Sequence, residues 1–331
     1  MPLVPSDNDL PVRKILAGAL CRRLPLNIRR IRMWRDRLYV VLGGGGWDED
    51  DAVDCNWPTE PQIVRGRLSG MKMALDLTDW MQRRSYFTGR FYQEELEDLL
   101  TAILRRGDNF VDVGANIGLV SLHAASLIGD AGKLWAFEPN PPVFARLIQH
   151  LEMNALDASR AFNMGLGSQK DELTLNLFGR HSGKASLLDH GSTVAKTVAV
   201  DIVRGDAALR NLDVTQPTVF KIDVEGFETS VLQGLGNLLD GNVAVVIEIS
   251  KSWLEAAGSS AEELYKLLDA YGLSPFVFGL AEKRMGRKLF VKPVHGVLEE
   301  DQYDCLFMRP ASCFAQRLGQ ALLPSDVHSA A

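Results

Sequence analysis

The chain has 331 residues and a formal net charge of −6, and 46% of its residues are hydrophobic and 24% charged. This composition is typical of a soluble globular protein, and its acidic balance gives no reason to expect a nucleic-acid partner. No stretch reaches the roughly 18 apolar residues of a membrane span, and no signal peptide is recognised. We therefore expect a cytoplasmic protein in which the four cysteines are reduced thiols.

Residues 1–60 form an N-terminal extension with a composition of its own. The first 40 residues contain nine lysines or arginines and three acids, and a loop rich in glycine and acids follows at residues 43–54. We expect a basic helical segment that packs on the protein with its charged face in water. Contact with a membrane surface through residues 10–40 is the alternative.

Residues 61–310 are expected to form the main domain, because apolar strands and amphipathic helices alternate there. Strands are predicted at 109–114, 133–139, 161–167, 219–226 and 243–250, and helices at 94–107, 119–129, 142–154, 228–239 and 259–272. Three terminal antiparallel strands are predicted within 274–310. Residues 168–200 are interpreted as an insertion and candidate substrate lid, and residues 311–331 as a C-terminal tail.

This alternation predicts a doubly wound α/β sheet. In such sheets ligands bind outside the carboxyl ends of the strands. The residues at those ends are therefore the candidates for a functional site.

The stretch "VDVGANIG" joins the strand at 109–114 to the next helix. Gly114, Ala115, Asn116 and Gly118 form a loop whose glycines allow a ligand to approach the backbone, and the helix start offers N–H donors. Glu138 ends the next strand and suits the two hydroxyls of a ribose. Loop and acid together predict a nucleoside-containing cofactor.

S-adenosylmethionine (SAM) fits these residues better than NAD does. A dinucleotide site has G-x-G-x-x-G, whereas here Asn116 occupies the place of the second glycine. Asp112 would repel a pyrophosphate but suits the ammonium of SAM. A tight turn with no ligand is the structural alternative.

The motifs "FVDVGANIGLVSL", "AFEPNPPVFARL", "VFKIDVEGFETSVLQG" and "VVIEIS" resemble the FkbM family of SAM-dependent methyltransferases over about residues 75–310. The resemblance implies a class I fold with seven strands in the order 3-2-1-4-5-7-6, and O-methylation of a sugar, glycan or natural product. It places Asp112, Gly114, Asn116 and Gly118 against SAM, Glu138 on the ribose, Asn140 close by and Asn163 toward the adenine. Where family members commonly carry an acid after Gly-x-aromatic, this chain has Tyr92.

The charged stretch "VFKIDVEG" would be the fourth strand, beside the first. Strict alternation puts Lys221, Asp223 and Glu225 on one face and Phe220, Ile222 and Val224 on the other. We expect Asp223 or Glu225 to act on the acceptor hydroxyl, Lys221 to neutralise one of them, and Glu248 to join the cluster. A structural ion-pair network is the alternative, and a divalent metal on these acids is not favoured.

Several functional alternatives stay open. The acceptor could be an amine rather than a hydroxyl, or the chain could bind SAM without catalysis. An NAD oxidoreductase is disfavoured by Asn116. His181 and His190, in the insertion, are rival bases but are more typical of surface histidines.

Overall fold

A computed structural model describes residues 10–24, 34, 37, 57–177, 185–186, 196–283 and 286–323. The chain divides into two compact units. Unit 1 comprises Met1–Glu97 and Leu280–Lys288, and unit 2 comprises Asp98–Gly279 and Leu289–Ala331. Within the described ranges, no helix combines the length and apolar character needed to cross a bilayer.

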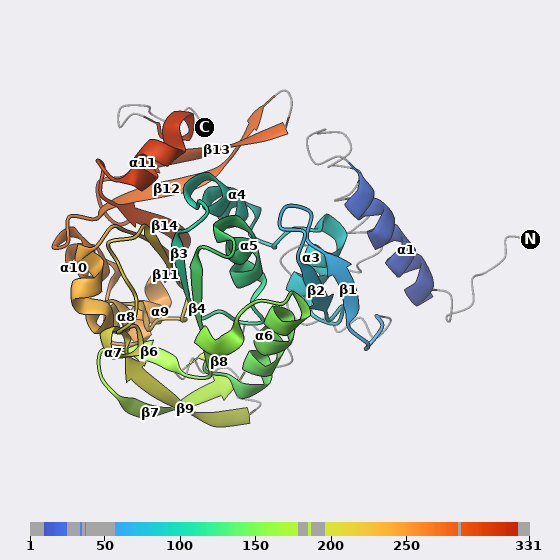
Figure 1. Ribbon diagram of the computed structural model, residues 1–331, viewed down its shortest axis with the longest axis horizontal. Coiled ribbons are helices and arrows are strands. Elements are labelled where there is room, and N and C mark those ends of the chain that lie inside the picture. Colours follow the sequence, from blue (N-terminus) through green and yellow to red (C-terminus); the bar gives the residue numbers. More distant parts are fainter. Residues whose placement is uncertain are drawn as a thin grey trace, which may run out of the picture. The chain divides into compact units, whose positions relative to one another are not determined.

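Unit 1 contains α1 (Leu10–Arg23), the antiparallel pair β1 (Gln62–Arg65) and β2 (Lys72–Leu75), α3 (Trp80–Thr88) and the start of α4 (Glu94–Ile103) (Figure 1). Helix α3 begins where the side chain of Asp79 accepts hydrogen bonds from the first-turn N–H groups of Met81 and Gln82. It ends at Gly89, which has the left-handed conformation common after helices (φ 69°).

The large sheet has eight strands in the order β13-β12-β14-β11-β10-β3-β4-β5. In chain order, its first four strands are β3 (Asn109–Val113), β4 (Lys133–Phe137), β5 (Ala161–Phe162) and β10 (Thr218–Ile222). The others are β11 (Val243–Ser250), β12 (Ser274–Lys283), β13 (Gly286–Pro293) and β14 (Gln302–Met308). The helices that alternate with them are α5 (Leu119–Ile128), α6 (Pro141–Met153), α7 (Gly205–Ala208), α8 (Glu228–Leu235), α9 (Lys251–Ala256) and α10 (Ala261–Asp269).

The predicted α/β doubly wound class is confirmed. Strands β5, β4, β3, β10 and β11 run parallel, and β14 pairs antiparallel with both β11 and β12. Without β13 and numbered in chain order, the strands of this sheet lie in the order 3-2-1-4-5-7-6. The sheet nevertheless has eight strands rather than seven, because β13 adds an edge strand beyond β12.

Strand alternation places one large hydrophobic cluster on one face of this sheet. Val111, Phe220 and Val245 pack there with Leu232 of α8 and Leu264 of α10. The opposite face of the same strands carries Asp112 and Lys221, which are register partners on β3 and β10. A polar pair therefore lies beside the core, at the carboxyl end of the two central strands.

A second, four-stranded sheet has the order β6-β9-β7-β8. Its strands are β6 (Gly165–Gly167), β7 (Asp171–Leu177), β8 (Ala185–Ser186) and β9 (Lys196–Arg204). The single strand expected at 161–167 is therefore wrong, since it divides into β5 in the large sheet and β6 in the small one. The insertion predicted at 168–200 contains β7, β8 and part of β9; its role as a lid stays a prediction, and much of it lies outside the described residues.

The antiparallel strands predicted within 274–310 are present among the described residues. Strands β12, β13 and β14 form where antiparallel strands were expected, and α11 (Cys313–Leu318) follows. Ser260 caps α10 by accepting from the backbone N–H of Glu263 at 3.2 Å. The compact units follow other boundaries than the predicted segments 1–60, 61–310 and 311–331, which were drawn from motifs and remain predictions.

Candidate active site

The loop between β3 and α5 has three left-handed residues, Gly114 (φ 77°), Asn116 (φ 50°) and Gly118 (φ 86°). A Cβ on Gly114 would lie 1.9 Å from the backbone oxygen of Asp223. Glycine at 114 is thus required by the close approach of the neighbouring strand end as well as by its dihedral angles. The glycines were predicted to make room for a ligand, and the structure adds an internal reason for one of them.

Glu138 holds this loop from the end of β4. One of its carboxylate oxygens accepts the N–H of Asn116 at 2.8 Å, and the other accepts the N–H of Asn140 at 2.9 Å. Burial raises the pKa of Glu138 to about 7, although these two backbone donors oppose the shift. Each oxygen keeps a second lone pair, so that Glu138 is still able to accept from a ligand hydroxyl.

Asn140, at the start of α6, is 6% exposed. Its side-chain oxygen is buried and has no hydrogen-bond partner among the residues that the structure describes. Since an unsatisfied buried acceptor is costly, this oxygen fits a site that a donor group of a ligand completes. Asn163, by contrast, uses its amide to bind the backbone oxygens of Glu138 and Pro139, at 2.8 and 2.9 Å. Its observed contacts hold the loop that carries Glu138.

Asp112 is fully buried near the carboxyl end of β3. It accepts a hydrogen bond from Ser121 at 2.6 Å, and its other carboxylate oxygen lies 3.5 Å from the ammonium nitrogen of Lys221. Desolvation raises the pKa of Asp112, against the attraction of Lys221. Its observed partners are therefore protein groups, and its predicted contact with a ligand ammonium stays a prediction.

Lys221 links the two central strands. Its Nζ donates to the backbone oxygen of Gly114 at 2.8 Å and lies 3.2 Å from a carboxylate oxygen of Asp223. Burial acts to lower the pKa of Lys221, but Asp223 and Asp112 outweigh it, and the net shift is upward. Lys221 is thus a fixed cation, and the prediction that it neutralises a neighbouring acid agrees with the geometry.

Strand β10 ends at Ile222, so the alternation expected through Glu225 is wrong. Glu225 lies in the loop before α8 with a left-handed backbone (φ 53°), an uncommon conformation for a residue with a long side chain. Glu228 stabilises this loop: one of its carboxylate oxygens accepts from the N–H groups of Val224 and Gly226, at 3.3 and 3.1 Å. The direction of Glu225 is therefore set by a turn rather than by a strand.

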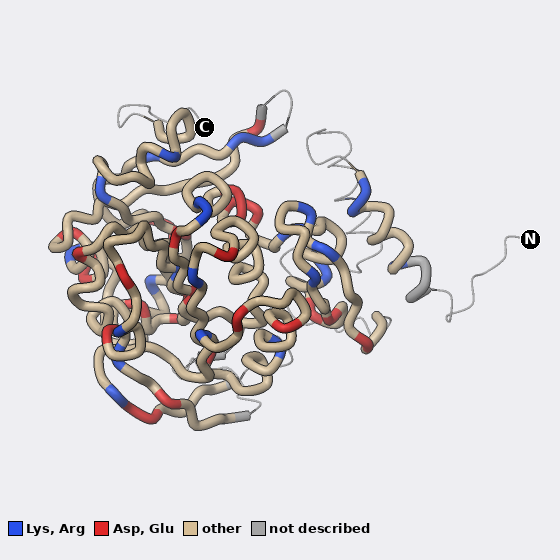
Figure 2. Tube along the Cα trace, viewed as in Figure 1, with Lys and Arg blue, Asp and Glu red and all other residues tan. Residues whose placement is uncertain are grey.

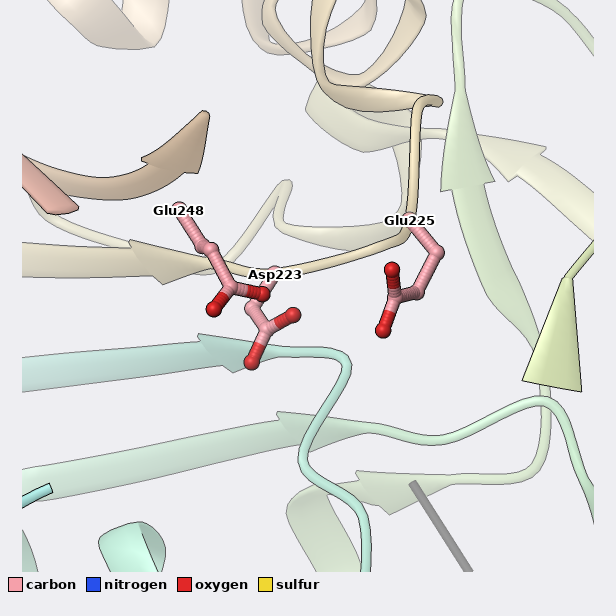
Figure 3. Close-up of side chains that lie close together, drawn as sticks. All are labelled: Asp223, Glu225 and Glu248. Carbon is pink, nitrogen blue, oxygen red and sulfur yellow. The ribbon is translucent and has the colours of Figure 1, made fainter. Parts of the chain in front are cut away.

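Three carboxylates meet at this edge of the sheet. Asp223 and Glu225 follow β10, Glu248 lies on the neighbouring β11, and each offers an oxygen within 4.8 Å of the others. Figure 3 shows the carboxyl groups of Asp223 and Glu248 close together, with the side chain of Glu225 directed toward them from the loop. The structure thus brings together the acids that the sequence grouped.

Crowding changes the protonation of this cluster. Asp223 is the main cause that raises the pKa of Glu248 to about 11, with burial and Asp304 adding to it. Burial, followed by Asp223 and Glu228, raises the pKa of Glu225 to about 8. At neutral pH the cluster therefore holds protons that separate carboxylates would have lost.

Asp223, Glu225 and Glu248 are also placed to share a divalent cation, because hard cations prefer carboxylate oxygens. Such clusters also occur without an ion, and the expectation that no metal is bound remains a prediction. His181 and His190, the rival bases, lie outside the described residues.

Two residues of the site were missed from the sequence. Glu228 belongs to the motif "VFKIDVEGFETSVLQG", and the motif alone did not indicate a role for it, although a glutamate at the start of a helix is a usual cap for preceding N–H groups. His150 is fully buried, and one of its ring nitrogens donates to the backbone oxygen of Ile117 at 2.6 Å. Its contact with the glycine loop had no signal in the sequence.

The methyltransferase FkbM domain model matches residues 112–274. The hexuronic acid methyltransferase AglP of Haloferax volcanii is 30% identical over 182 residues, which cover 55% of this chain and 70% of AglP. Methyltransferase 1 of Beauveria bassiana is 29% identical over 168 residues, covering 44% of this chain and 66% of that protein. The chain belongs to the FkbM family and is a methyltransferase.

Likeness to solved structures is more distant. A SAM-dependent O-methyltransferase from Thermotoga maritima has a TM-score of 0.36 at 12% identity, over 76% of this chain and 78% of its own. Fibrillarin from Aeropyrum pernix, solved with bound SAM, has a TM-score of 0.34 at 13% identity, over 62% and 68%. The fold therefore rests on the strand topology described above.

Proposed function

We propose that this methyltransferase transfers the methyl group of SAM to a hydroxyl of a sugar or glycan. The observation that carries the proposal is the acidic cluster of Asp223, Glu225 and Glu248, which lies one strand away from the loop held by Glu138. One side of this edge suits a nucleoside, and the other suits a hydroxyl that must lose a proton. AglP, by name a hexuronic acid methyltransferase, supports a sugar as the acceptor.

The residues around the glycine loop fit SAM. Glu138 would accept from the ribose hydroxyls through its remaining lone pairs, and the side-chain oxygen of Asn140 would gain the donor that it lacks among the described residues. The loop 114–118 would contact the cofactor through its backbone. Asp112 is fully buried and accepts a hydrogen bond from Ser121. It would therefore influence the cofactor site through its ion pair with Lys221.

Bound SAM supplies an electrophilic methyl group on a sulfonium. The protein must then hold the acceptor oxygen in line with that methyl group and take the hydroxyl proton as the new bond forms. Glu225 is best suited to this task, because its pKa of about 8 makes it a stronger base than an ordinary glutamate. Lys221 and Glu248 hold Asp223 between them, so that Asp223 can orient the hydroxyl.

The test is release of S-adenosylhomocysteine from SAM in the presence of matched acceptors. Glucuronate, glucose and glucosamine differ in a carboxylate and an amine but share ring hydroxyls, and the methylated product is located by NMR. We expect a methyl ether on glucuronate or glucose and none on nitrogen. Methylation of the glucosamine nitrogen alone would replace this proposal by the alternative of an N-methyltransferase.

SAM binding itself is tested by calorimetry, with NAD as the competing cofactor. We expect Glu138→Gln to weaken SAM binding by about tenfold, since it loses a charged acceptor for the ribose. Binding of NAD but not SAM would contradict the assignment of the glycine loop. The absence of nucleic acid from the partners and a cytoplasmic location remain predictions.

A further inference from the structure

Helix α1 buries a lysine and exposes two leucines. Lys14 is 4% exposed and Cys21 is fully buried, whereas Leu16 and Leu20 are 64% and 58% exposed. Leu16 and Leu20 are four residues apart and so are neighbours on one helix face. A helix that packs on a protein and otherwise meets water shows the opposite arrangement.

The buried side of α1 is well fixed within unit 1. Arg22 donates to the backbone oxygen of Tyr86 at 2.7 Å, and the Tyr86 hydroxyl donates to the backbone oxygen of Ile15 at 3.1 Å. A Cβ on Gly18 would lie 2.1 Å from the Tyr86 ring, so α1 meets α3 at close range. The ammonium of Lys14 lies 4.4 Å from the centroid of the Trp57 ring. The orientation that exposes the leucines is therefore held by specific contacts.

The exposed side of α1 is also basic. Arg23 follows Leu20 by three residues and is exposed, and α1 contains four lysines or arginines and no acid. Figure 2 shows the last turn of α1 in blue and its middle in tan. Further along the chain, Trp34 is 68% exposed and Arg37, three residues later, is exposed too. Apolar side chains beside arginine occur at both places.

We propose that the outer face of α1, formed by Leu16, Leu20 and Arg23, together with Trp34 and Arg37, docks on an anionic lipid surface. Exposed leucine and tryptophan insert at the level of the headgroups, and arginine attracts anionic lipids. A second copy of the chain fits less well. A two-fold contact along this face would bring only cations together, since α1 has no acid to pair with them.

The test is co-sedimentation of the full-length protein with phosphatidylcholine vesicles that contain or lack phosphatidylglycerol. We expect binding to the anionic vesicles only, and its loss at high salt. L16S/L20S should weaken this binding by about tenfold or more, and R23E and W34A should weaken it as well. Release of S-adenosylhomocysteine with a soluble acceptor should be unchanged, because the face lies outside the catalytic residues.

Two matched controls distinguish binding through this surface from nonspecific adsorption to the vesicles. I63S removes an exposed isoleucine from β1, and K170E makes the charge change of R23E at an exposed residue of unit 2. Both should sediment as the wild type does. Equal binding to neutral vesicles, no binding, or binding unchanged in L16S/L20S would overturn the proposal. So would light scattering that shows a wild-type dimer dissociated by L16S/L20S, because the face would then join two copies.

Discussion

Glu225 combines a strained backbone, a place in the acidic cluster and a raised pKa. Its backbone is left-handed, its carboxyl group lies within 4.8 Å of those of Asp223 and Glu248, and its pKa is raised to about 8. Backbone strain of this kind costs about 1–3 kcal/mol and persists where the surrounding structure fixes it. Glu228 supplies that support through the N–H groups on either side of Glu225.

The pH dependence of methyl transfer should report this glutamate. A base acts only after it has lost its proton, so kcat of the wild type should rise with pH through about 8 and then level off. Glu225→Gln keeps the size of the side chain but cannot accept the proton. We expect kcat to fall about 10²–10⁴-fold and the rise near pH 8 to disappear.

The matched control is Glu255→Gln, which removes an exposed glutamate of α9. Its rate and pH profile should equal those of the wild type. If Glu225→Gln instead kept the wild-type profile, another member of the cluster would take the proton. Calorimetry with SAM in both variants separates loss of chemistry from loss of cofactor binding.

At the level of helices and strands, some sequence patterns predict the structure without knowledge of contacts between distant residues. The alternation of apolar strands with amphipathic helices predicted most of the large sheet, because a buried parallel strand must be apolar over several residues. The same pattern gave the wrong position for Glu225. Strand alternation assumes a pleat, and the pleat stops at Ile222, after which the backbone of Asp223 passes close to Gly114.

The candidate site was accessible from sequence for a related reason. Parallel strands align their carboxyl ends, so acids that follow β10 and an acid near the end of β11 must meet at one edge. What sequence could not supply is how buried groups are satisfied. The contacts of Asp112 with Ser121 and Lys221 depend on packing between elements. The inverted exposure of α1 likewise depends on how it meets Tyr86.

The close approach of the two strand ends makes a testable prediction for Gly114→Ala. The added methyl group would meet the backbone oxygen of Asp223 at 1.9 Å, on a residue with φ 77°. We expect a loss of about 2–4 kcal/mol in the free energy of unfolding, from overpacking together with left-handed strain. Urea unfolding measures it, and methyl transfer should fall because Asp223 is displaced.

Gly70→Ala is the matched control for this variant. Gly70 also has a left-handed backbone (φ 68°), but a Cβ there meets nothing within 4 Å. Its cost should be the strain alone, roughly 1–2 kcal/mol, with activity kept. Equal losses in the two variants would mean that the approach of Asp223 to Gly114 relaxes at no cost.

At the scale of the whole chain, the large sheet is completed by β14, the last of its strands in chain order. Strand β14 lies between β11 and β12, so the large sheet is continuous only after residue 308 has been placed. Arg309 then donates to the backbone oxygens of Leu239, Gly241 and Tyr271, which belong to earlier connections. Formation of unit 2 thus requires contacts between residues far apart in sequence, which slow folding.

Helix α11 continues this closure, although residues 311–331 were expected to be a tail. Phe314 is fully buried, and the guanidinium of Arg317 binds both carboxylate oxygens of Asp108, at 2.5 and 3.1 Å. Phe314→Ala should therefore lower the free energy of unfolding by about 3–5 kcal/mol, the range for a buried aromatic side chain. Gln316→Ala, at an exposed position of the same helix, should change it by less than about 0.5 kcal/mol. Equal urea midpoints for both variants would show that α11 is a separable tail; a loss confined to Phe314→Ala would make it part of the folded unit that carries the site.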